Sequence, residues 1–144
     1  MEPNGLTPGT LLRHDTYRIE RTLGHGGFGI TYLATDLSLD RLVAIKEFFP
    51  GNFCNRETKL YGNTSLNITG NREFVNKMRA KFLKEARNIA KLDHPGIIKI
   101  HSAFEENNTA YYVMDYIHGS TLAEIVSQQG PLPEDKALEY IRKI

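Results

Sequence analysis

The stretch that decides the fold is Leu23-Gly24-His25-Gly26-Gly27-Phe28-Gly29, followed by the β-branched and aromatic residues of 30–35. Residues 17–23 alternate between apolar and polar side chains, so the glycines are predicted to lie between two strands. The turn residues of 36–41 and the apolar run 42–45 predict a third strand. Because a parallel pair needs a crossover of about a dozen residues or more, three strands joined this closely must be antiparallel.

The rest of the chain predicts one long helix and two further strands. Asn71 is expected to be its N-cap, and a spacing of three or four puts a set of apolar residues on one face: Phe74, Met78, Phe82, Ala86 and Ile89. His94-Pro95-Gly96 ends this helix, and strands follow at 97–101 and 110–116 about a turn at 106–108. Residues 58–61 and 64–68 flank a Gly-Asn pair and allow a small hairpin. The predicted fold class is α+β, a five-stranded antiparallel sheet with one long helix after the third strand.

Composition and charge narrow the classes of partner. Lys and Arg number 18 and Asp and Glu 17, so the net charge of +1 gives no global reason to expect nucleic acid or an anionic membrane. No apolar run approaches the roughly 20 residues that span a bilayer, and the first residues lack a signal-peptide pattern. The one cysteine, Cys54, lies among polar residues and is expected to be a solvated loop thiol. A cytoplasmic location fits these features.

The glycines indicate an anion site made by backbone groups. Without Cβ atoms they let the chain adopt positive φ and approach a ligand, so that inward N–H groups cradle phosphate oxygens. The same spacing occurs in dinucleotide-binding proteins, and Glu47 lies near the place of their ribose-binding acid. In those proteins a helix follows the glycines, whereas residues 30–35 favour a strand. A plain glycine turn in a hairpin is the other alternative.

Lys46 and Glu85 form the second candidate element. Lys46 ends an apolar strand, where a charged side chain is unusual, and Glu85 borders the apolar face of the predicted helix. A carboxylate at that border is expected to be paired, because an unpaired buried charge is costly. We therefore expect an ion pair between Lys46 and Glu85 that positions the ammonium for phosphate oxygens. The alternatives are a lysine that reaches into solvent and a solvated helix glutamate.

In combination, these residues resemble the N-terminal lobe of a protein kinase. The glycine motif, Val43-Ala44-Ile45-Lys46 and Glu85 match the signature of that family, and residues 26–34 and 46–50 are most similar to bacterial serine/threonine kinases of the eukaryotic type. The resemblance runs from about residue 17 to residue 144. It implies a lead-in at 1–16, an N-lobe at 17–118 with an insertion at about 50–70, and a hinge exit with the start of a truncated C-lobe at 119–144.

The resemblance also implies a role for each site residue. Lys46 and Glu85 would be the catalytic pair, with Lys46 on the α- and β-phosphates of ATP. Met114 matches the gatekeeper position, and Thr121 falls where kinases often contact ribose, although a helix cap explains it equally well. The nucleotide-binding residues implied are Leu23, Gly24, His25, Gly26, Gly27, Phe28, Gly29, Thr31, Ala44, Lys46, Met114, Asp115, Ile117 and Thr121. No metal ligand is implied in this chain.

Departures from the family pattern limit what the chain alone is expected to do. Thr31 stands in place of a valine, and the insertion separates Lys46 from Glu85. The H-R-D-x-x-x-x-N, D-F-G and A-P-E motifs are missing, and with them the catalytic base and the ligands of Mg²⁺. We therefore expect the ATP-binding lobe of a kinase that phosphorylates Ser/Thr hydroxyls of protein substrates, and no activity from the 144 residues alone.

The sequence leaves a second function open and also makes a prediction about self-association. A non-catalytic nucleotide-sensing or interaction module of kinase-like fold is the competing function. Residues 133–144 predict a last helix with the apolar stripe Ala137, Ile141 and Ile144, which has no evident partner in the chain. This stripe predicts either a homodimer or a frayed last helix.

Overall fold

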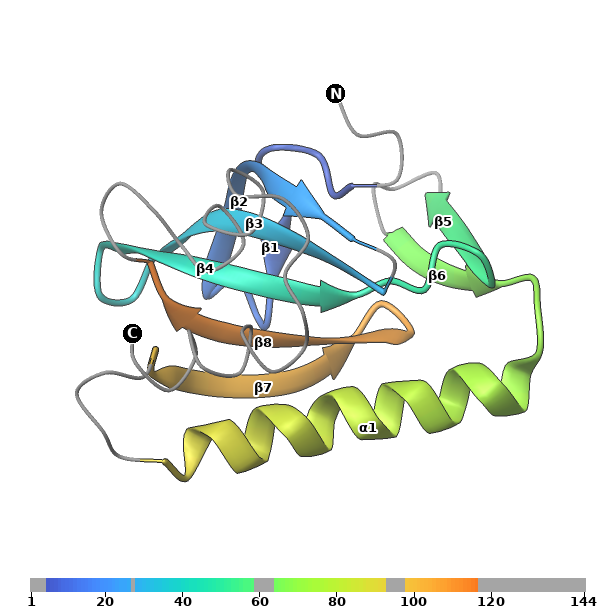
Figure 1. Cartoon of the computed structure of the whole chain (residues 1–144). Coiled ribbons are helices and arrows are strands. Elements are labelled where there is room, and N and C mark those ends of the chain that lie inside the picture. Colours follow the sequence, from blue (N-terminus) through green and yellow to red (C-terminus); the bar gives the residue numbers. More distant parts are fainter. Residues whose placement is uncertain (1–4, 27, 59–63, 93–97, 117–144) are drawn as a thin grey trace.

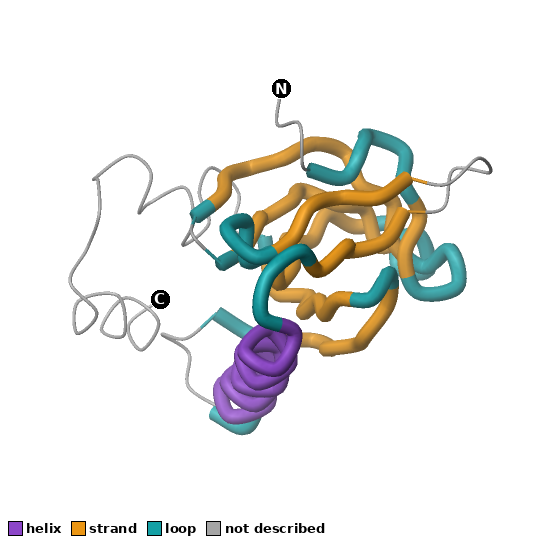
Figure 2. Tube along the Cα trace, turned by 90° about the vertical axis from the view of Figure 1, so that its right-hand side faces the viewer, coloured by secondary structure: helices purple, strands orange, loops and turns teal. Residues whose placement is uncertain are grey.

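The computed structural model describes residues 5–26, 28–58, 64–92 and 98–116. Their main feature is a six-stranded antiparallel sheet in the order β1-β2-β3-β4-β8-β7, with one long helix packed along β7 and β8 (Figure 1). Viewed along the helix, the sheet curls above it (Figure 2). The elements are β1 (Leu11–Leu12), β2 (Tyr17–His25), β3 (Gly29–Asp36), β4 (Arg41–Phe48), β5 (Cys54–Thr58), β6 (Thr64–Ile68), α1 (Arg72–Ala90), β7 (Ile100–Glu106) and β8 (Thr109–Asp115).

The meander predicted around the glycines is present as β2, β3 and β4. β3 and β4 pair without interruption from Gly29 opposite Phe48 to Asp36 opposite Arg41. The pairing of β2 with β3 is irregular between Ile19 and Arg21 and again between Thr22 and Gly24, where the glycine-rich stretch begins. The predicted α+β class with a helix after the meander is therefore confirmed.

Residues 5–16 pack on the sheet rather than forming an irregular lead-in. Leu11 and Leu12 pair with β2 and add a strand to the five predicted. Leu6 and Leu12 are buried in the apolar cluster that β2, β3 and β4 share. Single apolar residues between prolines and glycines show no strand periodicity, which is why the sequence did not reveal this packing.

Helix α1 begins where the sequence predicts. The side chain of Asn71 accepts a hydrogen bond from the Phe74 amide at 3.0 Å and makes Asn71 the N-cap. The buried face is rotated from the predicted one, because Val75 and Leu83 are buried whereas Phe74 is 37% exposed. The ring of Phe74 packs instead on Phe53 of the inserted segment, at 4.9 Å between centroids. Helix periodicity alone does not show this contact.

The inserted segment forms the hairpin β5–β6 and corrects two expectations. Strand β6 occupies the predicted 64–68, but β5 lies at Cys54–Thr58 instead of 58–61. Cys54 is buried, and its thiol donates to the carbonyl oxygen of Pro50 at 3.2 Å, so the prediction of a solvated loop thiol is wrong. Alternate residues of a strand face opposite sides, so polar sequence neighbours do not make a residue exposed.

Strand β7 extends to Glu106 rather than ending at residue 101. Asn107 and Asn108 have φ values of 56° and 58°, which suit a two-residue hairpin turn and let the β7–β8 ladder continue up to it. The predicted helix at 133–144 and its apolar stripe lie outside the described residues.

Candidate functional site

The glycine-rich segment connects β2 to β3. The Gly26 amide donates to the Gly29 carbonyl at 2.9 Å, and the Phe49 amide donates to the Phe28 carbonyl at 2.9 Å. The Phe28 side chain is exposed. Gly24, Gly26 and Gly29 do not have positive φ, so the expected left-handed backbone is not found at these three glycines. The remaining glycine, at position 27, lies outside the described residues.

Gly29 is required for another reason, which is the close approach of the Lys46 side chain. A Cβ at Gly29 would lie 3.0 Å from Lys46 Cε and 3.1 Å from the carbonyl oxygen of Glu47, closer than side chains normally pack. A Cβ at Gly24 or Gly26 would meet no atom within 4 Å. The fold thus places the lysine beside the third glycine of the motif and leaves open space at the first two.

Three of the residues that the resemblance assigns to the nucleotide lie in one apolar cluster. Leu23, Ala44 and Met114 belong to it, and Ala44 lies opposite Met114 across β4 and β8. Thr31 is buried and lies opposite Lys46 across β3 and β4. These strands therefore bring an apolar surface next to the lysine.

The amide and the carboxylate of Asp115, at the end of β8, each have a hydrogen-bond partner. Its amide donates to the Lys99 carbonyl at 3.0 Å, and its carboxylate Oδ1 lies 2.5 Å from Nε2 of His101. His25 is an exposed residue at the end of β2. Ile117 and Thr121, the other two residues assigned to the nucleotide, lie outside the described part of the chain.

The expected ion pair between Lys46 and Glu85 is not formed. Both residues are described. The Lys46 ammonium does not lie within 4.0 Å of a carboxylate oxygen of Glu85, the limit for an ion pair. Lys46 is half-buried and Glu85 is exposed, and a solvated carboxylate needs no partner. The two still lie on facing elements, since the ring of Phe82 on α1 packs 5.1 Å from Tyr112, which lies opposite Lys46 in the sheet.

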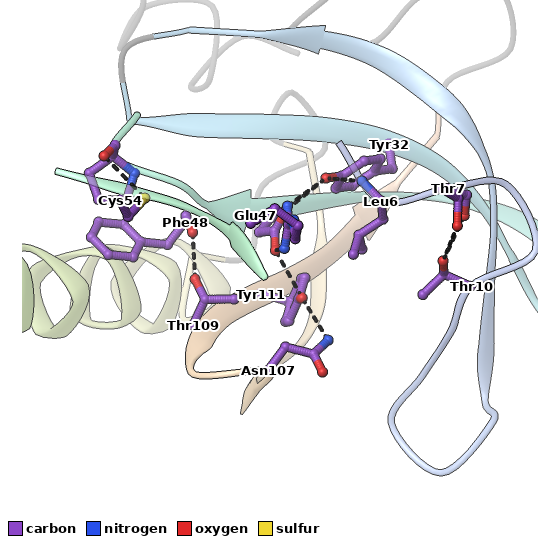
Figure 3. A network of polar contacts seen from close by, with 12 residues as sticks. Leu6, Thr7, Thr10, Tyr32, Glu47, Phe48, Cys54, Asn107, Thr109 and Tyr111 are labelled. Atoms are coloured by element: carbon purple, nitrogen blue, oxygen red, sulfur yellow. Dashed lines mark hydrogen bonds and ion pairs between the residues drawn. The ribbon is translucent and has the colours of Figure 1, made fainter. Parts of the chain in front are cut away.

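The buried carboxylate of this region belongs to Glu47, the residue after Lys46. It is fully buried and accepts four side-chain hydrogen bonds. Figure 3 shows Glu47 between Tyr32 and Tyr111. Arg56 of β5 donates twice, from Nη1 to Oε2 at 2.7 Å and from Nη2 to Oε1 at 2.6 Å. The Tyr32 hydroxyl donates to Oε1 at 2.7 Å, and the Tyr111 hydroxyl donates to Oε2 at 2.9 Å. Both oxygens of the carboxylate are therefore saturated.

The surroundings of this network fix its charge state. Burial raises the pKa of both Tyr32 and Tyr111, and the nearby charge of Glu47 raises each further. Burial acts to lower the pKa of Arg56, but its hydrogen bonds and charge attraction to Glu47 outweigh burial and raise that pKa. The arginine thus stays charged and the two phenols stay neutral across the physiological pH range.

The sequence suggests Glu47 only as the ribose-binding acid of the dinucleotide alternative and does not predict that it is buried and paired, although one signal is present. Val43, Ile45 and Glu47 alternate along one face of β4, so the glutamate occupies an apolar position of that strand. Its partner Arg56 comes from the insertion, whose packing no periodic pattern reveals. A buried carboxylate is paired here as expected, but this carboxylate is Glu47 and not Glu85.

The described residues show neither a cluster of metal-ligating side chains nor a helix that could span a membrane. They contain no group of three or more His, Cys, Asp or Glu side chains that could hold a metal ion. Helix α1, the helix of the described part, is not apolar enough over its length to cross a membrane.

Comparison with known proteins identifies the family. The model of the protein kinase domain matches residues 17–144. Serine/threonine-protein kinase PrkC of Bacillus subtilis is 34% identical over 128 residues, which cover 89% of this chain and 17% of that protein. Serine/threonine-protein kinase PknB of Mycobacterium tuberculosis is 32% identical over 131 residues, which cover 88% of this chain and 18% of that protein.

A solved structure supports the same conclusion. PpkA-294 in its apo form matches with a TM-score of 0.75 and 34% identity, over 88% of this chain and 43% of that chain. The fold and the site thus define a protein kinase N-lobe of the type found in bacterial serine/threonine kinases. The chain belongs to the protein kinase domain family, and it spans less than a fifth of the length of these curated relatives.

Proposed function

We propose that this chain is the nucleotide-binding lobe of an ATP-dependent serine/threonine protein kinase. The observation that carries the proposal is the contact of the Lys46 side chain with Gly29 in the glycine-rich connection. The ammonium of this side chain offers charge and hydrogen bonds to the phosphates of ATP. Leu23, Ala44 and Met114 supply an apolar surface for the adenine.

The full-length protein transfers the γ-phosphoryl group of ATP to a Ser or Thr hydroxyl of a protein substrate. Lys46 holds the α- and β-phosphates, and Glu85 orients the lysine when α1 moves toward β4. Bound Mg²⁺ neutralises charge on the phosphates, and in this family its ligands come from segments that follow this lobe. The catalytic-base motif of the family is absent from the 144 residues, so this chain alone transfers no phosphate.

We also propose a location for this chain and keep its self-association as a prediction. The chain works in the cytoplasm, where the free thiol of Cys54 stays reduced. A homodimer through the apolar stripe of the last predicted helix stays a prediction, because that helix lies outside the described residues.

The separation of Lys46 from Glu85 favours a second candidate function. A non-catalytic nucleotide-sensing module of kinase-like fold has no need for this ion pair. In the kinase proposal, the unpaired arrangement is instead an inactive state that closes on activation. The two candidates differ in whether phosphoryl transfer accompanies nucleotide binding.

Phosphoryl transfer by the full-length protein tests both candidates. We expect transfer from radiolabelled ATP to a generic protein substrate, reduced on the order of 100-fold or more in Lys46→Met because the phosphates lose their cation. Lys77→Met, which removes a charge from an exposed site on α1, is the matched control. ATP binding without transfer would favour the sensing module, and equal transfer by Lys46→Met and wild type would remove Lys46 from the site.

A further inference from the structure

Lys46 and Glu47 are neighbours on β4 with side chains on opposite faces of the sheet. Lys46 shares its face with Ala44 and Phe48, which belong to the two apolar clusters that also contain residues of α1. Glu47 shares its face with Val43 and Ile45, which belong to the third cluster. Any group that fixes the side chain of Glu47 therefore also fixes the strand segment that presents Lys46.

Arg56 is such a group. Its two terminal nitrogens contact the two oxygens of Glu47 at 2.7 and 2.6 Å, and the two side chains are 7% and 0% exposed. The guanidinium also lies over the ring of Phe49, at 4.8 Å from its centroid. A planar two-point contact fixes orientation as well as distance, which a lysine or a single hydrogen bond does not.

The hairpin that carries Arg56 also fixes the start of α1. The Phe53 carbonyl accepts hydrogen bonds from the amides of Thr69 and Gly70, at 2.8 and 3.0 Å, and so closes the base of the hairpin. Asn71, the N-cap of α1, follows directly. The ring of Phe53 packs on Phe74 in the first turn of the helix. The position of the helix start therefore depends on the hairpin.

The hairpin makes a further contact with the sheet at the β7–β8 turn. The Leu66 amide donates to the Asn107 carbonyl at 2.7 Å, and the Asn108 side chain donates to the Leu66 carbonyl at 2.9 Å. Arg79 of α1 donates to the Asn108 carbonyl at 2.9 Å. The hairpin, the β7–β8 turn and the helix thus form a closed set of contacts.

We propose that Arg56 is a positioning residue for the nucleotide site. By holding Glu47, it joins the hairpin to the strand of Lys46, and through Phe53 the hairpin sets the position of the helix that carries Glu85. The role of Lys46 and Glu85 in this inference rests on the proposed function. A buried ion pair adds little net stability because desolvation offsets the attraction, so geometry is the better explanation for this one.

Kinetics of the full-length protein test the inference with three variants. Arg56→Met leaves Glu47 buried without its cation, whereas the double variant Glu47→Gln/Arg56→Met removes both charges and restores a neutral, well-packed pair. Arg18→Met is the control, because Arg18 forms an exposed ion pair with Glu20 on β2. All assays are run below the lowest melting temperature of the set, with kcat and KM for ATP measured separately.

The double variant gives the decisive result. We expect it to regain most of the melting temperature lost by Arg56→Met while kcat stays on the order of 10- to 100-fold below wild type, since misplacement of a catalytic group slows the reaction without unfolding the protein. Arg18→Met should match wild type in both measurements. A double variant with wild-type kcat would show that Arg56 acts only on stability and would overturn the inference.

Hydrogen exchange of the full-length protein gives a second readout that needs no activity. We expect both Arg56 variants to lose amide protection over residues 72–83 of α1, while the amides of β2 and β3 keep the protection seen in wild type. Uniform loss over the whole lobe, or unchanged protection of α1, would contradict the inference. If wild type shows no phosphoryl transfer, the proposed function fails, and the exchange result still decides whether Arg56 positions the helix.

Discussion

Glu47 and Gly29 show how single residues set the geometry around Lys46. Glu47 lies directly after the lysine and accepts four hydrogen bonds, so its side chain has a single orientation. Gly29 lies on β3, the strand next to that of Lys46. Because it has no Cβ, it leaves space for the aliphatic stem of the lysine. The position of Lys46 thus depends on one residue that is fully bonded and one that has no side chain.

The contact at Gly29 predicts that even an alanine at this position lowers the stability of the lobe. Gly29→Ala should lower the free energy of unfolding by about 1–3 kcal/mol, because the new methyl group must displace the Lys46 stem or the Glu47 carbonyl. Urea unfolding followed by circular dichroism measures this change. Gly24→Ala is the matched control, since a Cβ there meets no atom within 4 Å. Equal stability of the two variants would contradict the contact.

Cys54 provides a second prediction at the residue scale. Burial raises the pKa of its thiol to about 11, so little thiolate forms at pH 8. We expect iodoacetamide to alkylate the native protein about 100-fold or more slowly than the urea-unfolded protein, whose thiol has an ordinary pKa. Mass spectrometry of timed samples follows the reaction. Rapid labelling of the folded protein would show that β5 opens readily or that Cys54 is exposed.

At the scale of elements, the connection between the hairpin and α1 explains where the helix starts. A Cβ at Gly70 would lie 2.8 Å from the ring of Phe53, so the chain passes this point only as glycine. Asn71 then caps the helix, and Phe74 packs back on Phe53. The hairpin base and the first helical turn therefore form one packed unit.

This unit predicts the effect of removing the cap. Asn71→Ala should lower the free energy of unfolding by about 1 kcal/mol, because an amide of the first turn loses its acceptor. Asn88→Ala, at an exposed position within the same helix, should be neutral or slightly stabilising because alanine has the higher helix propensity. Thermal unfolding of both variants gives the comparison, and a more stable Asn71→Ala would refute the capping role.

Local patterns were sufficient to predict the meander, the helix and its cap. Strand alternation and short turns determine β2, β3 and β4, and Asn71 precedes an amphipathic repeat. The remaining features depend on contacts between distant segments. The burial of Leu6, the pairing of Arg56 with Glu47 and the rotation of Phe74 toward Phe53 each join residues that no common period connects.

The candidate site, too, combines features that sequence motifs predict with features that depend on contacts between distant segments. The motifs name the residues of this site, and the structure places Gly29 beside Lys46 and groups Leu23, Ala44 and Met114 in one apolar cluster. Whether Lys46 and Glu85 meet depends on the position of α1 against the sheet, which packing and the inserted hairpin determine. A motif gives the identity of the two residues but not the distance between them.

At the scale of the whole lobe, the network around Glu47 connects segments from both ends of the described chain. The Leu6 amide donates to the Tyr32 oxygen at 3.0 Å, and the Asn107 side chain donates to the Tyr111 oxygen at 3.0 Å. Four other segments, β3, β4, β5 and β8, contribute the groups between them. Unfolding of the lobe must therefore expose both phenols at once.

This arrangement predicts that the lobe loses stability at alkaline pH. Burial and then the charge of Glu47 raise the pKa of Tyr32 and Tyr111, whereas an unfolded tyrosine ionises near pH 10. The folded state therefore binds more protons above pH 10, and each phenol should lower the free energy of unfolding by about 1.4 kcal/mol per pH unit in that range. The raised pKa of Cys54 acts in the same direction.

Spectroscopic titration of the lobe separates the two phenols from the other tyrosines. The chain has seven tyrosines, and we expect the phenolate absorbance of Tyr32 and Tyr111 to appear only together with the loss of the circular dichroism signal. Tyr32→Phe removes one of the two ionising groups, so stability should fall less steeply with pH in this variant, although its loss of the hydrogen bond to Glu47 lowers stability at neutral pH. Complete ionisation of all seven phenols near pH 10 in a protein that is still folded would show that the network around Glu47 is open to water.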